Sequence, residues 1–243
     1  MVSVSCIYDE GSMVDTMLIG AKGFSVLIEA DGKRIMLDTG LRDRYLVNNM
    51  EFMEIDPDSI DVLAISQATP DNCRAINGLI EARTKPLEVY APAGLYAGKK
   101  GFLSSQVGLT EENRGKVVLH DTGDWIELAD GVWLSPQVGG ESFMAVRGKR
   151  TALISARGAS GPRPLLAAYR ERFGSDPKVF IGSVVLEKRK KPVAEAYAAD
   201  FEAYGTPEMH LNHSTGYDGI GNLRAHFGLN AIREFYAGMR LEL

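Results

Sequence analysis

The side chains best suited to metal or acid–base chemistry are few and widely spaced in this chain. Imidazole and thiolate groups bind zinc, iron and copper, and the sequence contains four histidines and two cysteines. They are His120, His210, His213, His226, Cys6 and Cys73. His210 and His213 would face one side of a helix, but residues 209–211 are typical of a strand end. The spacing therefore predicts no paired histidine site.

Most members of this set are expected in structural positions. We expect His210 to be a structural or surface residue, His120 a turn residue at a strand end, and His226 a residue that packs against the core from the last helix. Cys73 is typical of a buried thiol on a helix, and Cys6 of an ordinary strand residue. Two cysteines cannot frame a disulfide scaffold in a chain of 243 residues.

The elements that must position these side chains are strands and helices in alternation. Apolar runs of short period predict strands, and spacings of three and four residues predict helices. Strands are expected at residues 24–29, 34–38, 60–66, 87–90, 116–119, 125–128, 132–135, 142–146, 151–155, 179–185 and 208–211. Helices are expected at residues 42–52, 71–83, 162–173, 193–204 and 219–227. Asp31-Gly32 predicts a hairpin turn between the first two listed strands.

Hairpins interleaved with helices favour a layered α/β arrangement over a doubly wound parallel sheet. We expect two mixed sheets packed face to face, with helices outside them. The chain contains no linker rich in proline, serine or glycine, so residues 1–243 are expected to form a single domain.

The composition is that of an average globular protein, with 45% hydrophobic and 24% charged residues and a net charge of −5. This mild acidity argues against a nucleic-acid partner. The N-terminus lacks the features of a signal peptide, and no apolar run is long enough to span a membrane. We therefore expect a cytoplasmic protein with reduced thiols and no membrane partner. The basic run at residues 187–191 is typical of a solvated loop ahead of a helix.

Several segments, taken in order, resemble one known family. GFSVLIEADGKRIMLDTG at residues 23–40 is similar to the opening of metallo-β-lactamase-fold proteins, and the likeness continues through residues 46–50 and 55–61. His213-Ser214-Thr215-Gly216 resembles a His-Cys-Thr-Gly segment of the branch related to archaeal dihydropterin phosphate synthase. The resemblance implies a four-layer αββα sandwich and a metal-dependent hydrolase ancestry.

The chain departs from that family at its metal ligands. The family pattern Ser-His-x-His-x-Asp-His corresponds here to Ser66 followed by Gln67-Ala68-Thr69-Pro70-Asp71-Asn72. Only Asp71 matches a ligand. By the same resemblance, Ala159 and Val185 stand where two later histidines are expected, and His213 alone is retained.

The loss of these histidines removes most donors that a dinuclear metal site needs. Zinc sites use three or four nitrogen, oxygen or sulfur ligands, and amides and hydroxyls are poor substitutes for imidazole. We therefore expect no metal cofactor. The alternative is one weakly bound zinc, iron or manganese ion held by Asp71 and His213, with Asn72 or Gln67 assisting.

The same segments predict the residues of a ligand-binding cleft. The set is Asp38, Gln67, Thr69, Asn72, Arg157, Ser214 and Thr215. In the family, the residue corresponding to Asp38 holds the metal-binding loop by hydrogen bonds. Ser214 and Thr215 precede a helix whose N-terminus could hold an anion, to which Arg157 would add positive charge. In the alternative interpretation these residues only cap and pack a helix, and Asp71 serves as the N-cap of its own helix.

These observations lead to three hypotheses about function. The first is a metallo-β-lactamase-fold protein that has lost its metal site and acts without catalysis, by small-molecule or protein binding. The second is a residual hydrolase or transferase acting on a phosphorylated small molecule through a weak single-metal site. The third is a structural subunit, which predicts a large exposed apolar patch. The expected partners are a small anionic or phosphorylated ligand and a second copy of the chain.

Overall fold

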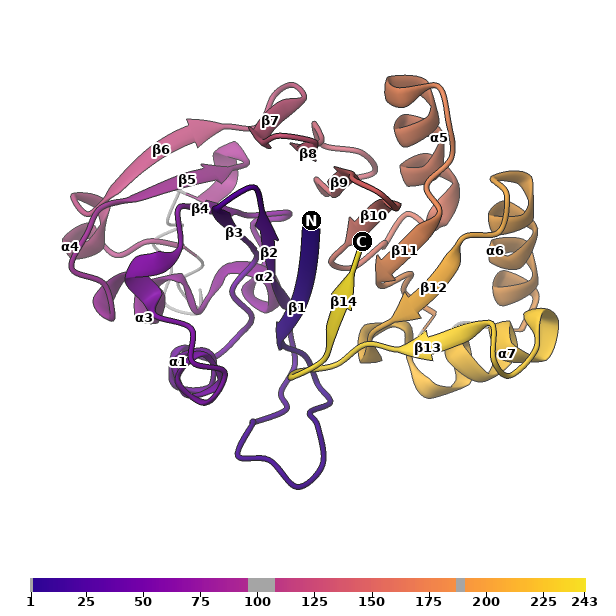
Figure 1. Cartoon of the computed structure of the whole chain (residues 1–243), viewed down its shortest axis with the longest axis horizontal. Helices are drawn as coiled ribbons and strands as arrows, with labels where there is room; N and C mark the ends of the chain where they lie inside the picture. Colours follow the sequence, from indigo (N-terminus) through magenta and orange to yellow (C-terminus); the bar gives the residue numbers. More distant parts are fainter. Residues whose placement is uncertain (1, 96–107, 187–190) are drawn as a thin grey trace, which may run out of the picture.

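The protein is built on two mixed β-sheets that pack face to face (Figure 1). The computed structural model describes residues 2–95, 108–186 and 191–243. The first sheet contains, in spatial order, β14 (Arg240–Glu242), β1 (Val2–Tyr8), β2 (Ser25–Ala30), β3 (Lys33–Leu37), β4 (Val62–Ala64), β5 (Leu87–Ala91) and β6 (Val117–Asp121). The second contains β13 (Ile232–Glu234), β12 (Glu208–Leu211), β11 (Val179–Gly182), β10 (Thr151–Ser155), β9 (Met144–Arg147), β8 (Val132–Leu134) and β7 (Ile126–Ala129).

Each sheet joins an antiparallel part to a parallel part. Strands β14 to β3 pair antiparallel, and β3 to β6 pair parallel. In the second sheet β7 to β10 pair antiparallel, and β10 to β13 pair parallel. The predicted hairpin turn between β2 and β3 is present, with positive φ angles of 49° at Asp31 and 76° at Gly32. Two successive positive φ angles match the twist of a hairpin.

Helices cover the outer face of each sheet, as Figure 1 shows. They are α1 (Asp43–Phe52), α2 (Pro70–Cys73), α3 (Ile76–Glu81), α4 (Glu111–Arg114), α5 (Pro162–Phe173), α6 (Lys191–Ala203) and α7 (Tyr217–Phe227). Short 3₁₀ turns occur at η1 (Pro57–Ser59), η2 (Ala93–Leu95) and η3 (His213–Thr215). No helix among the described residues is both long and apolar enough to cross a membrane.

Three apolar clusters fill the spaces between neighbouring layers. Side chains such as Ile28 of β2 and Ile154 of β10 fill the space between the sheets. Leu46 of α1 belongs to the cluster outside the first sheet, and Leu165 of α5 and Phe201 of α6 belong to the cluster outside the second. The predicted four-layer αββα sandwich is therefore confirmed.

Some local predictions were wrong. The helix expected at residues 71–83 is two short helices, because the Ala75 N–H bonds to the Gly40 carbonyl instead of continuing one helical ladder. His120 lies within β6, where its ring stacks on Tyr90, rather than in a turn. His226 is exposed on α7 and pairs with a carboxylate of α6 instead of packing in the core. Most of the predicted basic loop, residues 187–190, lies outside the described residues.

Candidate functional site

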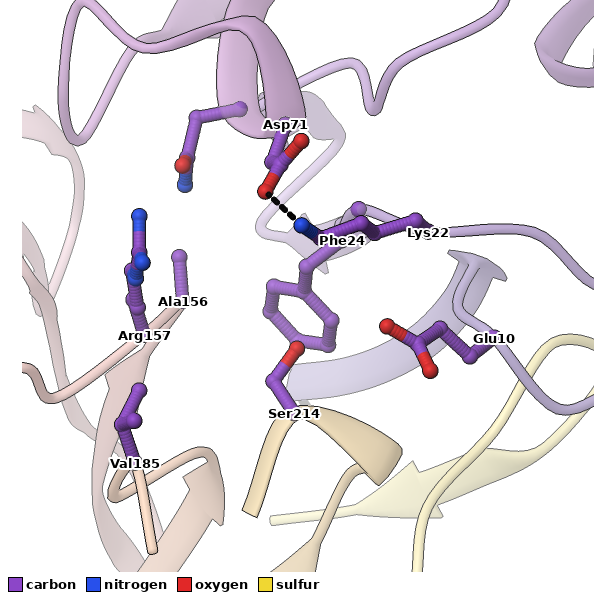
Figure 2. A pocket seen from close by; sticks show the side chains of 10 residues that line it. Glu10, Lys22, Phe24, Asp71, Ala156, Arg157, Val185 and Ser214 are labelled. Carbon is purple, nitrogen blue, oxygen red and sulfur yellow. Dashed lines mark ion pairs between the residues drawn. The ribbon is translucent and has the colours of Figure 1, made fainter. Parts of the chain in front are cut away.

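A small pocket opens where loops from both halves of the sandwich meet (Figure 2). Its volume is about 70 Å³. Its lining residues come from the loop between β1 and β2, from α2, from the loops after β10 and β11, and from η3. They are Glu10, Lys22, Gly23, Phe24, Asp71, Asn72, Ala156, Arg157, Val185 and Ser214.

Asn72 is held by its neighbours on the protein side of this pocket. The residue is 3% exposed. The Asn72 amide donates to Asp38 Oδ2 at 2.7 Å and to Ser66 Oγ at 3.1 Å. Its carbonyl oxygen accepts from Thr69 Oγ1 at 2.7 Å. Both amide hydrogens are thus used in holding the loop that carries the motif segment.

Asp38 is the centre of that loop's hydrogen bonding. It is fully buried and accepts from Ser66 N at 2.7 Å, Ser66 Oγ at 2.6 Å and Asn72. Burial raises the pKa of the Asp38 carboxyl from 3.8 to about 7, although these hydrogen bonds lower it. Asp38 therefore holds the loop by hydrogen bonds, the role that the family resemblance implied, and does not line the pocket.

Gln67 ties the same loop to the second half of the sandwich. Its amide donates to the Gly140 carbonyl at 2.9 Å. Ser66 adds a second connection, because its carbonyl accepts from the Ser142 N–H at 2.8 Å. Next to these residues, the buried Glu141 accepts from Ser155 Oγ at 2.6 Å. The polar side chain of Gln67 thus serves a contact between the two halves.

Asp71 lines the pocket but is paired with a lysine. Its Oδ2 lies 3.2 Å from Lys22 Nζ. Asp71 is the second residue of α2, and Thr69 occupies the N-cap position, so the N-cap role considered for Asp71 is not observed. The ammonium of Lys22 supplies a positive charge next to the Asp71 carboxylate.

His213 lies in η3, outside the pocket lining. Its Nδ1 is 2.6 Å from Oδ2 of the buried Asp9, and this bond raises the pKa of His213. Its ring packs against Tyr217 and Tyr236, with centroid distances of 5.6 and 6.2 Å. A Cβ on Gly11 would come within 2.1 Å of this ring, so glycine is needed there. Asp71 and His213 are therefore each paired with a different residue.

The donor set does not fit the dinuclear metal centre of the resembled family. The described residues contain no group of three or more histidine, cysteine, aspartate or glutamate side chains that could hold a metal ion. The polar groups of the pocket lining are the Asn72 amide, the Ser214 hydroxyl, the Glu10 carboxylate, the Arg157 guanidinium and the Lys22–Asp71 ion pair. Of the two positions where the resemblance expects later histidines, Val185 lies in the lining and Ala159 lies outside it. Imidazole and thiolate, the ligands that zinc prefers, are missing from its lining.

The predicted cleft residues divide into two groups. Asp71, Asn72, Arg157 and Ser214 line the pocket. The others, which lie outside its lining, are Asp38, Gln67, Thr69, Thr215 and His213. Thr215 is buried, 3.4 Å from Ser183 through the two hydroxyl oxygens.

Five lining residues were missed by the sequence reasoning: Glu10, Lys22, Gly23, Phe24 and Ala156. In Figure 2, Arg157 lies on one side of the pocket, Glu10 and Lys22 lie on the other, and the Phe24 ring lies between them in this view. Arg157 is half-buried and makes no hydrogen bond or ion pair with the residues that the structure describes. Its guanidinium is the one cation of the lining that lacks such a partner within those residues.

The chain was compared with protein-family models, with curated proteins and with solved structures. No protein-family model matches the chain. A segment of 124 residues is 25% identical to 7,8-dihydropterin-6-methyl-4-(β-D-ribofuranosyl)-aminobenzene-5'-phosphate synthase of Methanocaldococcus jannaschii. It covers 48% of this chain and 42% of that enzyme, so the likeness extends over less than half of either protein.

Solved structures match over the whole chain. Tm1679, described as a metal-dependent hydrolase of the β-lactamase superfamily, has a TM-score of 0.80 at 21% identity, covering 100% of this chain and 99% of its own. The metallo-β-lactamase fold protein YhfI of Bacillus subtilis has a TM-score of 0.67 at 12% identity, with 100% and 99% covered. A diphosphatase of the PhnP family has a TM-score of 0.63 at 14% identity, with 100% and 98% covered. The chain therefore has the metallo-β-lactamase fold that its sequence resemblance predicted.

Proposed function

We propose that this protein is a non-catalytic member of its fold that binds a small anionic ligand in the pocket without a metal ion. The observation that carries the proposal is the bonding of the motif segment. Gln67, Asp71 and Asn72 direct their polar groups to Gly140, Lys22 and Asp38, respectively. The buried Gln67 Oε1 has no hydrogen-bond partner among the described residues, but the other polar groups named here are directed to protein partners and not to one common point where a cation would sit.

The anionic nature of the ligand is supported by Arg157. A guanidinium carries five N–H donors in a planar fork that matches carboxylate and phosphate groups. Arg157 lines the pocket and has no bonded partner among the described residues. Ser214 lies in the same lining and brings a hydroxyl group. A phosphate or carboxylate group would satisfy both side chains.

The helix N-terminus is not part of this proposal. Helix α7 begins at Tyr217, and Asp218 brings negative charge to its first turn. None of its residues lines the pocket. The anion is therefore assigned to Arg157 rather than to the dipole of α7.

The geometry does not favour a residual metal-dependent enzyme. A single-metal site was expected to use Asp71 and His213, with Asn72 or Gln67 assisting. In the structure Asp71 pairs with Lys22, and His213 pairs with Asp9. These pairs use Asp71 Oδ2 and His213 Nδ1, but His213 lies outside the pocket that Asp71 lines, and the described residues bring no group of three or more histidine, cysteine, aspartate or glutamate side chains together.

Elemental analysis tests the metal-free part of the proposal. The protein, purified without chelator, is expected to contain well under one zinc, iron or manganese ion per chain. A stoichiometric ion that persists after dialysis would overturn the proposal and support a metal enzyme.

Calorimetric titration with inorganic phosphate tests the anion. Arg157→Ala is expected to weaken binding at least about tenfold, because it removes the cation that faces the ligand. Arg44→Ala, which removes an exposed arginine of α1 outside the lining, is the matched control and should bind as the parent protein does. Equal affinity of the Arg157 variant and the parent would contradict the assignment.

Pairing of two copies is a separate proposal. The exposed apolar side chains that support a protein contact include Val14 and Met17 of the loop between β1 and β2, and Tyr217 at the start of α7. Light scattering coupled to size-exclusion chromatography tests it, and a mass of one chain at high concentration would exclude a stable homodimer.

A further inference from the structure

We infer that Glu141 is the positioning residue of the anion site, because its carboxylate holds the loop that presents Arg157 to the pocket. The inference rests on the proposed function and deepens it by naming the residue that sets the geometry of that site. Arg157 belongs to the loop that follows β10 and lies next to Ala156 at the pocket (Figure 2). Glu141 lies outside the pocket lining, so it acts on a ligand only through this loop.

Glu141 bonds to the loop on both sides of Arg157. The residue is buried, with 1% of its surface exposed. Its Oε1 accepts from Ser155 Oγ at 2.6 Å, and its Oε2 accepts from the N–H groups of Gly158 at 2.8 Å and Ala159 at 3.4 Å. Arg157 lies between these anchored residues in the sequence. The backbone that carries the guanidinium is therefore held at both ends by the same carboxylate.

The backbone of Glu141 is itself held, so the carboxylate starts from a fixed point. Val138 and Glu141 exchange backbone hydrogen bonds across a tight turn, at 2.8 and 3.3 Å. The next residue, Ser142, donates its N–H to the Ser66 carbonyl in the first half of the sandwich at 2.8 Å. A binding group on a loop that is already ordered loses less conformational entropy when the ligand arrives, and it binds more tightly for that reason.

The conformation of Gly158 brings the loop to Glu141. Its φ angle is +60°, in the left-handed region that glycine adopts readily. A Cβ at this position would come within 2.2 Å of the Ser183 carbonyl oxygen, so the loop approaches β11 closely where its N–H reaches the carboxylate. The Gly158 carbonyl in turn accepts from the Gly161 N–H at 3.0 Å, which closes the loop on itself.

Three substitutions of Glu141 test the inference, because they separate the reach of the side chain from its charge. Glu141→Gln keeps the length: its oxygen can accept from Gly158, and its amide can donate to Ser155 Oγ, whose proton turns to the Ser183 carbonyl 3.3 Å away. Glu141→Asp keeps the charge but is one methylene shorter, and Glu141→Ala removes both acceptors. In calorimetric titration with inorganic phosphate, Glu141→Gln is expected to bind no more than about threefold more weakly than the parent. Glu141→Asp and Glu141→Ala are expected to bind about tenfold more weakly.

The controls separate positioning from a general loss of stability. Ile28→Ala weakens the core between the sheets at a distance from the loop, and it should bind phosphate as the parent does. Circular dichroism of each variant reports whether it is folded, and the comparison of Glu141→Gln with Glu141→Asp remains decisive where Glu141→Ala does not fold. Hydrogen exchange at Gly158 and Ala159 should be slow in the parent and in Glu141→Gln, and faster in Glu141→Asp.

The outcomes distinguish this inference from the proposed function. Phosphate binding that is weakened equally in Glu141→Gln and Glu141→Asp, or in neither, would overturn the positioning role and leave the anion site at Arg157 standing. A tenfold loss in Ile28→Ala would also overturn it, because stability rather than the loop would then set the affinity. Failure of the parent protein to bind phosphate would overturn the proposed function together with the inference.

Discussion

At the scale of single residues, Asn72 holds the segment between Asp38 and α2 in place. It joins Asp38, Ser66 and Thr69 through three hydrogen bonds in a buried setting. In Asn72→Ala, Asp38 and Ser66 each lose a hydrogen-bond donor, and the Thr69 hydroxyl loses its acceptor. This loss is expected to lower the free energy of unfolding by about 1–3 kcal/mol. Urea denaturation measures this loss. Asn230→Ala changes an exposed asparagine and should stay within about 0.5 kcal/mol of the parent; equal stability of the two variants would contradict the structural role.

Asp38 gives the protein a pH dependence of defined sign. Burial raises the pKa of this carboxyl from 3.8 to about 7 in the folded state, so the folded protein holds a proton that the unfolded chain has released. Its contribution to stability is fully present below about pH 4 and is lost as the pH rises through 7, by at most about 1.4 kcal/mol per pH unit. Urea denaturation at several pH values between 5 and 8 should show a shallower decline in Asp38→Asn. Parallel declines in the two proteins would contradict the raised pKa.

The residues of the site were predictable only where they follow a strand or a recognisable segment. Asp71, Asn72, Arg157 and Ser214 belong to segments with family counterparts, and all of them line the pocket. Lys22, by contrast, reaches the pocket from a loop without periodicity, and its partner Asp71 lies 49 residues away in sequence. Such a pairing depends on tertiary structure, and no local sequence pattern predicts it.

At the scale of elements, the buried side-chain amide of Asn49 holds the loop between β1 and β2 to helix α1. The Asn49 amide donates to the carbonyls of Ile7 and Ile19 at 2.9 and 3.0 Å, and its oxygen accepts from the Ile19 N–H at 2.8 Å. Asn49→Ala is therefore expected to speed hydrogen exchange at residues 17–21 and to cost about 1–3 kcal/mol of stability.

An exposed asparagine outside this loop provides the control. The neighbouring Asn48 is unsuitable, because it donates to the Met17 carbonyl and to Asn49 Oδ1, at 3.2 and 3.3 Å. Asn230→Ala should change stability by no more than about 0.5 kcal/mol and leave exchange at Ile19 unaltered. If exchange at residues 17–21 stays slow in Asn49→Ala, the loop is held by other contacts and the prediction is wrong.

Several of the elements that the sequence did not predict are short. Strands β13 and β14 contain three residues each, too few for an alternating pattern to be visible. Strand β1, with seven residues, was missing from the predicted strand ranges too, whereas the three-residue strands β4 and β8 lie within predicted ranges. The pairing of β14 depends on β1, at the opposite end of the chain. The break between α2 and α3 has a similar origin, because a contact with Gly40 outside the helix decides it. Longer helices such as α5 carry enough periodic residues to be predicted from spacing alone.

At the scale of the whole molecule, the order of the layers follows from the sequence, because every strand and helix must bury its apolar face against a neighbouring layer. Apolar strands bounded by turns must form sheets, and amphipathic helices must cover their outer faces. The spatial order of the strands does not follow from these rules. In particular, β14 follows all strands of the second sheet in the sequence but pairs with β1 in the first sheet.

This return predicts that the chain unfolds as one unit. Ile28 of the first sheet and Ile154 of the second share one apolar cluster, so a cavity in either sheet weakens the contact between them. Both tryptophans, Trp125 and Trp133, lie at or in the strands of the second sheet and report on that half. Ile28→Ala is expected to cost about 2–5 kcal/mol. The substitution should lower the urea midpoint by the same amount whether unfolding is followed by tryptophan fluorescence or by far-ultraviolet circular dichroism.

The size of the fluorescence shift decides between one cooperative unit and two. If the halves unfold independently, removing a methyl-rich side chain from the first sheet leaves the tryptophan midpoint where it was and splits the dichroism curve. The converse variant, Ile154→Ala in β10, then moves the fluorescence midpoint and also splits the dichroism curve. In a single unit both variants move both signals together, because the strands that flank the shared cluster cannot lose their partners one sheet at a time. Coincident shifts in the two variants would therefore establish that residues 1–243 fold as the single domain that the sequence predicts.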